Sequence, residues 1–202
     1  MVYPEISRFL ESLSLSEPHE ERDAKWQNLA AKISADDFSG AVDFICTHNA
    51  RRSAISQSLF AALAHEHSFD KLISWSGGAE VTFIHPNTIA ALQRIGFRLS
   101  EKQGEENPVY FLRFSDEQDA LRLFSKKFDD ETTPGPYHAV LVCSKGDAAC
   151  PFIPMVKTRN LIPFEDPGYA DGTPEADQAY DQAVKEIGSD LKKFFSYLTA
   201  LR

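Results

Sequence analysis

The 202-residue sequence predicts a three-layer α/β fold, with a central four-stranded parallel sheet, helices on both faces and an N-terminal helical extension. Short β-branched and aromatic runs alternate with segments of helical apolar spacing, which is typical of βαβ units. The run 138–143 is apolar at almost every position, as in a strand buried on both faces. A stripe of apolar residues from Tyr180 to Leu198, spaced by three and four, predicts a long C-terminal helix that covers the sheet.

Composition and charge restrict the class of protein. The length fits one α/β domain with an appendage. A net charge of −9 argues against nucleic acid or an anionic membrane as partner, because both would be repelled. Apolar runs are far shorter than the roughly 20 residues of a membrane span, and the N-terminus lacks a signal pattern, so we expect a cytoplasmic protein. Three cysteines fit reduced, catalytic thiols better than a disulfide framework.

The chain divides into a helical extension over residues 1–38 and a catalytic domain over residues 39–202. Two apolar stripes predict two helices within residues 1–36. The extension could pack against the sheet, form a dimer or cover the site, and packing is favoured.

Within the domain, runs of apolar residues predict four strands of the parallel sheet, at 41–46, 72–75, 108–114 and 138–143. Helices are expected over 53–66, over 88–95 with Asn87 as N-cap, and from 173 onward. Gly77 and Gly78 predict a turn after the second strand.

The stretch from Cys46 to Ser53 predicts an anion-binding loop of the form C-x5-R-S between a strand and a helix. Inward-pointing amides and the helix dipole bind an oxyanion and favour a nucleophilic thiolate at Cys46. Arg52 supplies a planar, two-pronged donor for the transition state. The remaining loop residues are Thr47, His48, Asn49, Ala50, Arg51 and Ser53, whose hydroxyl can donate to the Cys46 sulfur. The alternative is that Cys46 is a buried strand-end residue, but Arg52 and Ser53 in register favour the nucleophile.

Further motifs extend this pattern: Phe164-Glu165-Asp166-Pro167, the pair Cys143 and Cys150, and Gly78-Ala79-Glu80-Val81 followed by His85-Pro86-Asn87. With the loop, they resemble the low-molecular-weight protein tyrosine phosphatase superfamily and, within it, the thioredoxin-coupled arsenate reductases. The resemblance covers roughly residues 40 to 200.

The resemblance implies a thiol relay. Cys46 attacks arsenate, Cys143 then attacks Cys46, arsenite leaves, and Cys150 captures Cys143 as a disulfide that thioredoxin reduces. From the residues alone, Cys46 and Cys143 both end strands, and sites in parallel sheets collect at the carboxyl ends of strands, so the two thiols can meet. The alternative is two unrelated cysteines near a loop.

The resemblance also implies that Asp166 is the general acid. Its alternative is an ordinary Asp-Pro turn at the surface. The implied function is arsenate reduction with residual phosphatase activity. The chief alternative is a tyrosine phosphatase with a phosphocysteine intermediate and a phosphoprotein partner. We favour reduction because hydrolysis requires neither Cys143 nor Cys150, and because Gly168 precedes Tyr169 where phosphatases have an aromatic residue.

A third alternative is a binding module for oxyanions or phosphopeptides, but mere binding requires neither Cys46 nor Asp166. We expect no cofactor or metal. Some reductases of the family bind potassium near the loop asparagine, here Asn49, but Gln57 stands where an acidic residue is expected, which argues against that cation site.

Overall fold

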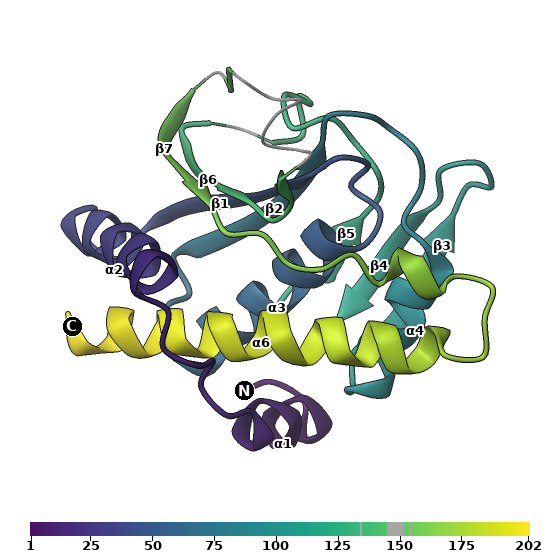
Figure 1. Ribbon diagram of the computed structural model, residues 1–202, viewed down its shortest axis with the longest axis horizontal. Coiled ribbons are helices and arrows are strands. Elements are labelled where there is room, and N and C mark those ends of the chain that lie inside the picture. The colour runs from purple at the N-terminus through teal and green to yellow at the C-terminus, as the bar shows by residue number, and fades with distance from the viewer. Residues whose placement is uncertain (134, 145–151, 154) are drawn as a thin grey trace.

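The computed structural model describes residues 1–133, 135–144, 152–153 and 155–202. Four parallel strands form the central sheet in the order β2-β1-β6-β7 (Figure 1). Their bounds are Gly40–Cys46 for β1, Leu72–Gly78 for β2, Tyr137–Leu141 for β6 and Val156–Leu161 for β7. The predicted α/β fold with a four-stranded parallel sheet flanked by helices is therefore confirmed.

The other elements surround this sheet. The helices are α1 (Pro4–Ser12), α2 (Glu20–Ala35), α3 (Arg52–Glu66), α4 (Pro86–Arg94), the 3-10 helix η1 (Pro167–Ala170) and α6 (Ala176–Ala200). A separate antiparallel sheet contains β3 (Arg98–Gln103), β4 (Val109–Arg113) and β5 (Leu121–Leu123). None of the helices among the described residues has the length and apolar content to cross a membrane.

One strand of the parallel sheet was predicted wrongly, and one was missed. The run 108–114 forms β4, which lies in the antiparallel sheet, and the remaining strand of the parallel sheet is β7. Residues of β4 alternate between buried and half-buried, as in a sheet with one wet face. The strand β7 is an edge strand that carries Lys157 and Arg159, and such charges suit an edge but hide the apolar pattern of a strand.

Two local predictions also differ from the structure. Gly77 and Gly78 are not a turn but the end of β2, paired with the last residues of β1. The N-cap of α4 is His85 rather than Asn87, since the Nδ1 atom of His85 accepts a hydrogen bond from the backbone N–H of Asn87 at 3.3 Å. Pro86 follows as the first helical residue, where the lack of an N–H has no cost.

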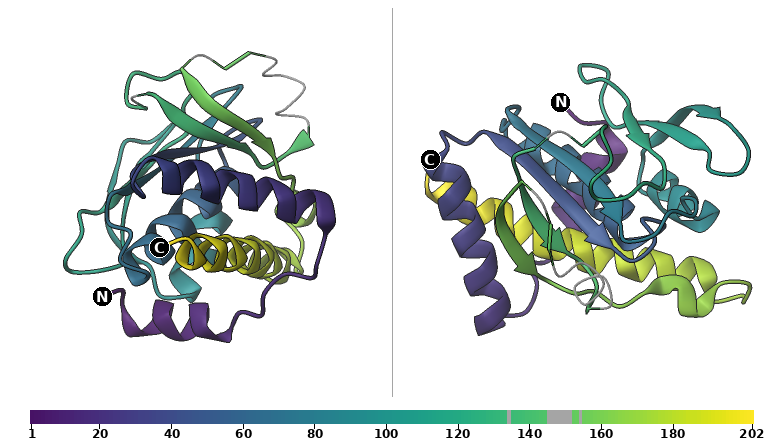
Figure 2. Two further views of the ribbon diagram at one scale, coloured as in Figure 1. Left: turned by 90° about the vertical axis from the view of Figure 1, so that its left-hand side faces the viewer. Right: turned by 90° about the horizontal axis from the view of Figure 1, so that it is seen from above.

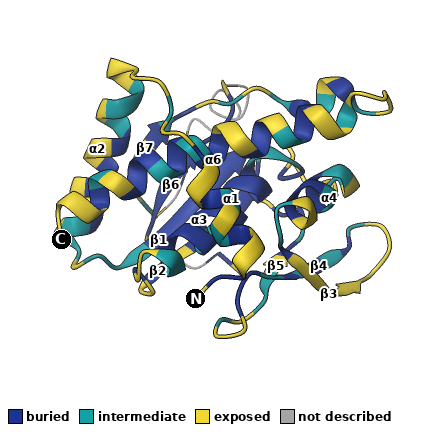
Figure 3. Cartoon of the chain, turned by 90° about the horizontal axis from the view of Figure 1, so that it is seen from below, coloured by how far each residue is buried: buried dark blue, intermediate teal, exposed yellow. Residues whose placement is uncertain are grey.

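The main core lies on one face of the sheet, between β1, α3 and α6. The predicted stripe of α6 is confirmed, because each of its members is buried: Tyr180, Val184, Ile187, Leu191, Phe194 and Leu198. Figure 3 shows this buried stripe along α6, opposite an exposed one. Each large apolar side chain buried in this way contributes about 1.5–3 kcal/mol.

Both predicted N-terminal helices form and pack into the main core. The left view of Figure 2 looks along α6, which lies between α1 and α2. Trp26 of α2 is buried, and its ring lies 5.3 Å from that of Phe194. Ile6 and Leu10 of α1 are buried in the same cluster. Packing, the favoured role for residues 1–38, is therefore what these helices do.

The opposite face of the sheet has a smaller apolar cluster that includes Ile45 of β1 and Leu141 of β6. Asp43 of β1 lies on this face and is fully buried, and neither of its carboxylate oxygens has a hydrogen-bond partner among the described residues. Burial raises the pKa of Asp43 to about 7, and the nearby charge of Lys126 only partly offsets this. The central strand thus contains an acid that the folded protein favours in its neutral form.

Candidate active site

The loop between β1 and α3 is held open by its neighbours, which bind its carbonyl oxygens from outside. The carbonyl oxygens of Cys46, Thr47, His48 and Ala50 accept from Ala79 N (3.2 Å), Glu80 N (2.8 Å), Ser125 Oγ (2.8 Å) and His85 N (3.0 Å), respectively. With the carbonyl groups turned outward, the amides face the centre of the loop. Among the residues that the structure describes, the backbone amides of 47–51 donate no hydrogen bond. These amides are available to an anion.

Gly78 allows this arrangement, because the end of β2 lies directly against the loop. A Cβ atom at Gly78 would lie 2.7 Å from the backbone nitrogen of Asn49 and 2.8 Å from the carbonyl oxygen of Thr47. Real Cβ atoms essentially never approach so closely, so only glycine fits without displacing the loop.

Cys46 lies at the base of this loop, as predicted. Its side chain is buried, and its sulfur lies 3.1 Å from the Ser53 hydroxyl at the start of α3. A hydroxyl in that position stabilises a thiolate by donating a hydrogen bond to it.

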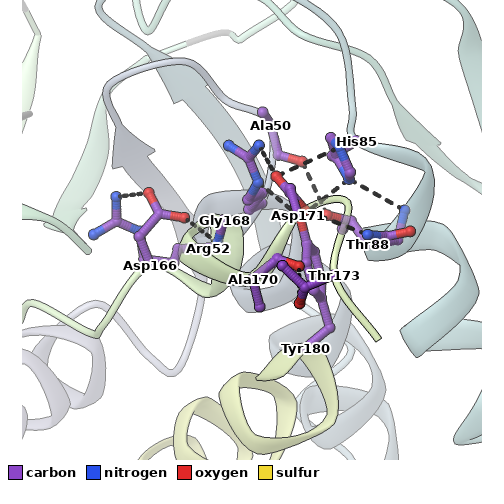
Figure 4. A network of polar contacts seen from close by, with 12 residues as sticks. Ala50, Arg52, His85, Thr88, Asp166, Gly168, Ala170, Asp171, Thr173 and Tyr180 are labelled. Atoms are coloured by element: carbon purple, nitrogen blue, oxygen red, sulfur yellow. Dashed lines mark hydrogen bonds and ion pairs between the residues drawn. The ribbon is translucent and has the colours of Figure 1, made fainter. Parts of the chain in front are cut away.

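Arg52 extends from the first turn of α3 toward the segment that carries Asp166. Its Nη1 atom donates to the Phe164 carbonyl at 3.0 Å, and its Nη2 atom forms an ion pair with the Asp166 carboxylate (Figure 4). The Nε atom of Arg52 is buried and has no hydrogen-bond partner in the part of the chain that the structure describes. Asp166 also caps η1, since its Oδ1 atom accepts from the backbone N–H of Gly168 at 3.0 Å.

These residues line one small pocket. Its walls are Cys46, Thr47, His48, Ala50, Arg51, Arg52 and Asp166. His48 is half-exposed at the rim, where its Nε2 atom lies 3.4 Å from Glu80. The pocket thus combines a nucleophile, a guanidinium, unpaired amides and a carboxylic acid. Displacement at a tetrahedral oxyanion requires these groups.

Cys143 also comes to this loop. It is buried two residues after β6 ends, and its sulfur lies 3.5 Å from the hydroxyl of Thr47. Cys143 thus lies beside Thr47, the residue that follows Cys46 in the loop. Cys150 lies outside the described residues.

Asn49 occupies the left-handed region of the loop, with a φ angle of 49°. Its Oδ1 atom accepts from the Ser76 hydroxyl at 3.3 Å, and the same hydroxyl lies 2.6 Å from Oε1 of Gln57. Asn49 and Gln57 thus share one hydroxyl of β2. In the part of the chain that the structure describes, no three histidine, cysteine or acidic side chains gather as metal ligands.

Arg51 has a role that sequence reasoning missed. Its Nε atom donates to the Tyr180 hydroxyl at 2.7 Å, and its Nη2 atom pairs with Asp171. The Tyr180 hydroxyl donates to Asp171 at 2.8 Å and lies 3.0 Å from Nδ1 of His85. This Arg51 network ties the loop to α4, α6 and the residues after Asp166.

The charges in the Arg51 network are matched. Burial opposes the charged form of Asp171, but hydrogen bonds from Tyr180 and Arg51 outweigh it and hold the pKa of that carboxyl below its ordinary value. Burial lowers the pKa of His85, despite the attraction of Asp171. The network is therefore stable with one cation, one anion and a neutral imidazole. Only the arginine at position 51 hints at it in the sequence, since Asp171 and Tyr180 have no recognisable spacing.

Comparisons with known proteins give two kinds of similarity. The chain is 29% identical to arsenate reductases of Bacillus licheniformis and Bacillus subtilis over 154 residues, which cover 75% of this chain and 91% of each relative. No family model matches. Among solved structures, a low-molecular-weight protein tyrosine phosphatase from T. tengcongensis superposes with a TM-score of 0.53 at 18% identity, covering 78% of this chain and 99% of that one. The chain is thus similar in sequence to arsenate reductases, and it shares the fold of a low-molecular-weight protein tyrosine phosphatase.

Proposed function

We propose that this protein reduces arsenate through Cys46, with Cys143 and Cys150 as a thiol relay. The observation that carries the proposal is the buried Cys46 sulfur at the base of a loop with free amides and Arg52 at its rim. The similarity to arsenate reductases and the phosphatase fold supports an enzyme acting on oxyanions.

In the first step, the Cys46 thiolate attacks arsenic and forms a sulfur–arsenic bond. The amides of 47–51 and the Arg52 guanidinium bind the arsenate oxygens, and Asp166 gives a proton to the oxygen that departs as water. Ser53 holds the sulfur in place through its hydroxyl, 3.1 Å away.

In the second step, the Cys143 thiolate attacks the Cys46 sulfur. A disulfide bond forms, the sulfur–arsenic bond breaks, and its electron pair reduces arsenic from As(V) to As(III), which leaves as arsenite. The contact between Cys143 and Thr47 supports this step, because it puts the second thiol beside the loop.

In the third step, Cys150 attacks Cys143 and releases Cys46 as a thiolate. An external dithiol, for which we propose thioredoxin, then reduces the Cys143–Cys150 disulfide with two electrons and two protons. Such a relay requires a reducing compartment, in agreement with a cytoplasmic location.

The second candidate is phosphate-ester hydrolysis at the same residues, on a phosphoprotein or a smaller ester. Asp166 favours it, because an acid beside Arg52 suits protonation of an alcohol or phenol leaving group. Here Cys46 forms a phosphocysteine that water hydrolyses, and neither Cys143 nor Cys150 takes part.

The two functions separate in one experiment. Cys150→Ser is assayed for thioredoxin-dependent arsenate turnover and for aryl-phosphate hydrolysis, with Cys46→Ser as the inactive control. For a reductase, Cys150→Ser loses the first activity and keeps the second. If the wild-type protein shows no thioredoxin-coupled turnover but hydrolyses aryl phosphates through Cys46, hydrolysis is its function. If Cys46→Ser retains either activity, the proposed chemistry is wrong.

A further inference from the structure

The segment that carries Asp166 leaves the sheet just before the acid. After β7, the backbone N–H of Ile162 donates to the Leu141 carbonyl at 2.9 Å, and that of Phe164 donates to the Val142 carbonyl at 3.1 Å. Pro163 between them has no N–H to donate. The ladder thus ends two residues before Asp166, and the segment needs other contacts to hold its position.

Helix α2 of the N-terminal extension supplies those contacts. Lys25 donates to the carbonyl of Leu161 at 3.0 Å, and Nη1 of Arg22 donates to the carbonyl of Pro163, also at 3.0 Å. The guanidinium of Arg22 also lies over the ring of Phe164, 4.4 Å from its centroid. A planar guanidinium can both stack on a ring and donate at its edge, which lysine cannot.

Arg22 is itself fixed from below. Its Nε atom pairs with the carboxylate of Asp190 on α6, which is almost fully buried. The same carboxylate accepts a hydrogen bond from Nε1 of Trp26 at 3.1 Å. The Arg22 guanidinium therefore has one orientation, and it transmits the position of α2 and α6 to residues 163 and 164.

Phe164 connects this support to the candidate active site. Its ring lies under Arg22, while its carbonyl accepts the hydrogen bond from Arg52. Asp166 follows two residues later and pairs with the guanidinium of Arg52. We propose that Arg22 is a positioning residue for the acid step, which it serves by holding 163–164 so that Arg52 and Asp166 stay aligned with Cys46. This inference rests on the proposed function, and it makes the N-terminal extension part of the catalytic unit.

A leaving-group series of aryl phosphates tests this role in Arg22→Met. Phenyl phosphate needs a proton from Asp166 to release phenol, whereas 2,4-dinitrophenyl phosphate releases a stable anion without one. We expect kcat/KM for phenyl phosphate to fall about tenfold more than kcat/KM for the dinitrophenyl ester, because kcat/KM reports the step in which the leaving group departs, and displacement by a fraction of an ångström is costly in a proton transfer. A merely structural role would lower both rates equally.

Lys25→Met is the matched control. It removes the other hydrogen bond from α2 to this segment, but the acceptor of that bond is the carbonyl of Leu161, three residues before Phe164. It should keep the wild-type dependence on the leaving group. Arg22→Lys keeps the positive charge beside Asp190, so it should lose less of the phenyl phosphate rate than Arg22→Met does. If Arg22→Met does not fold, Arg22→Lys takes its place in the series. In an Asp166→Asn background, Arg22→Met should add no further leaving-group dependence, because the two residues act on one step.

The outcomes separate the inference from the proposed function. If the wild-type protein turns over neither arsenate nor aryl phosphates, the proposed function is wrong and the inference falls with it. If the wild type is active but the Arg22 and Lys25 variants match across the series, the inference alone is wrong. If only arsenate is turned over, the same comparison is made on its kcat, which should fall in Arg22→Met and not in Lys25→Met.

Discussion

Asp166→Asn should have opposite effects on oxyanion binding and on turnover. In the structure, the Asp166 carboxylate occupies one side of the Arg52 guanidinium. An incoming oxyanion needs that same guanidinium, so it must displace the carboxylate. Asparagine removes the competing charge and also removes the proton donor.

The burial of the two partners sets the expected magnitude. The Arg52 side chain is 12% exposed, but the Asp166 side chain is 42% exposed. A pair that is half open to water contributes about 1 kcal/mol, which corresponds to about fivefold in a dissociation constant. We therefore expect Asp166→Asn to bind phosphate about fivefold more tightly, while kcat for phenyl phosphate falls about 10²–10⁴-fold through loss of general acid catalysis.

Isothermal titration with inorganic phosphate measures the first effect, and steady-state hydrolysis of phenyl phosphate measures the second. Glu165→Gln, which removes an equal charge one position earlier, is the control and should leave phosphate binding near its wild-type value. If Asp166→Asn binds phosphate no more tightly than Glu165→Gln does, the Asp166 carboxylate does not compete for Arg52.

Three further variants test the structure around the site. Arg51→Met should lower the free energy of unfolding by about 2 kcal/mol, since it leaves Asp171 without its cation in a half-buried position. Because the folded-state pKa of Asp171 is held low, this loss should be full above pH of about 4 and shrink in acid, as urea unfolding at pH 7 and pH 3 will show. Asp43→Asn should remove a pH dependence of stability. Because the pKa of Asp43 is raised in the folded state, the free energy of unfolding of the wild type should fall by at most about 4 kcal/mol as pH rises from about 4 through 7. A wild-type stability that stays constant between pH 5 and 8 would contradict this. Gly78→Ala should push the backbone of Asn49 outward, lower stability by about 1–3 kcal/mol and abolish activity, so an active, equally stable variant would show that the loop yields easily.

The anion loop could be predicted from the sequence because its parts are contiguous. Cys46, Arg52 and Ser53 lie within eight positions, and the strand and helix that flank them have clear apolar patterns. In the structure, Cys46 and Arg52 line one pocket together with Asp166, which lies more than 100 residues away in the sequence, and Ser53 contacts the Cys46 sulfur. Asp166 was found only because its Asp-Pro motif resembles a known family.

Other features could not be predicted because they depend on tertiary contacts. Val156–Leu161 is the edge strand β7, and its charged residues conceal it, while Pro108–Phe114 has a stronger strand pattern but belongs to the other sheet. Arg51 was assigned to the anion loop by position, yet its side chain binds Tyr180 and Asp171. Arg22 on α2 has no motif at all, since its partners come from residues 163–190.

Arg51 makes contacts that hold the chain after Asp166 in place. Both members of the Arg51 ion pair are half-buried, with each side chain under 25% exposed, and Tyr180 fixes Arg51 further. Gly168 lies against it so closely that a Cβ atom would be 2.9 Å from the Arg51 guanidinium carbon. Arg51 therefore holds the segment after Asp166.

Arg22 holds the segment before Asp166, at the carbonyl of Pro163 and the ring of Phe164. Between these two anchors, the Asp166 side chain has only the Gly168 amide and Arg52 as partners among the described residues, and it is the more exposed of the two members of its ion pair. The backbone on either side of Asp166 is thus fixed. The Asp166 carboxylate can therefore release Arg52 to an oxyanion and still stay close to that oxyanion. A proton donor in this position needs a fixed backbone and a side-chain contact that it can exchange. It must leave the Arg52 guanidinium to the substrate and remain within reach of the leaving oxygen.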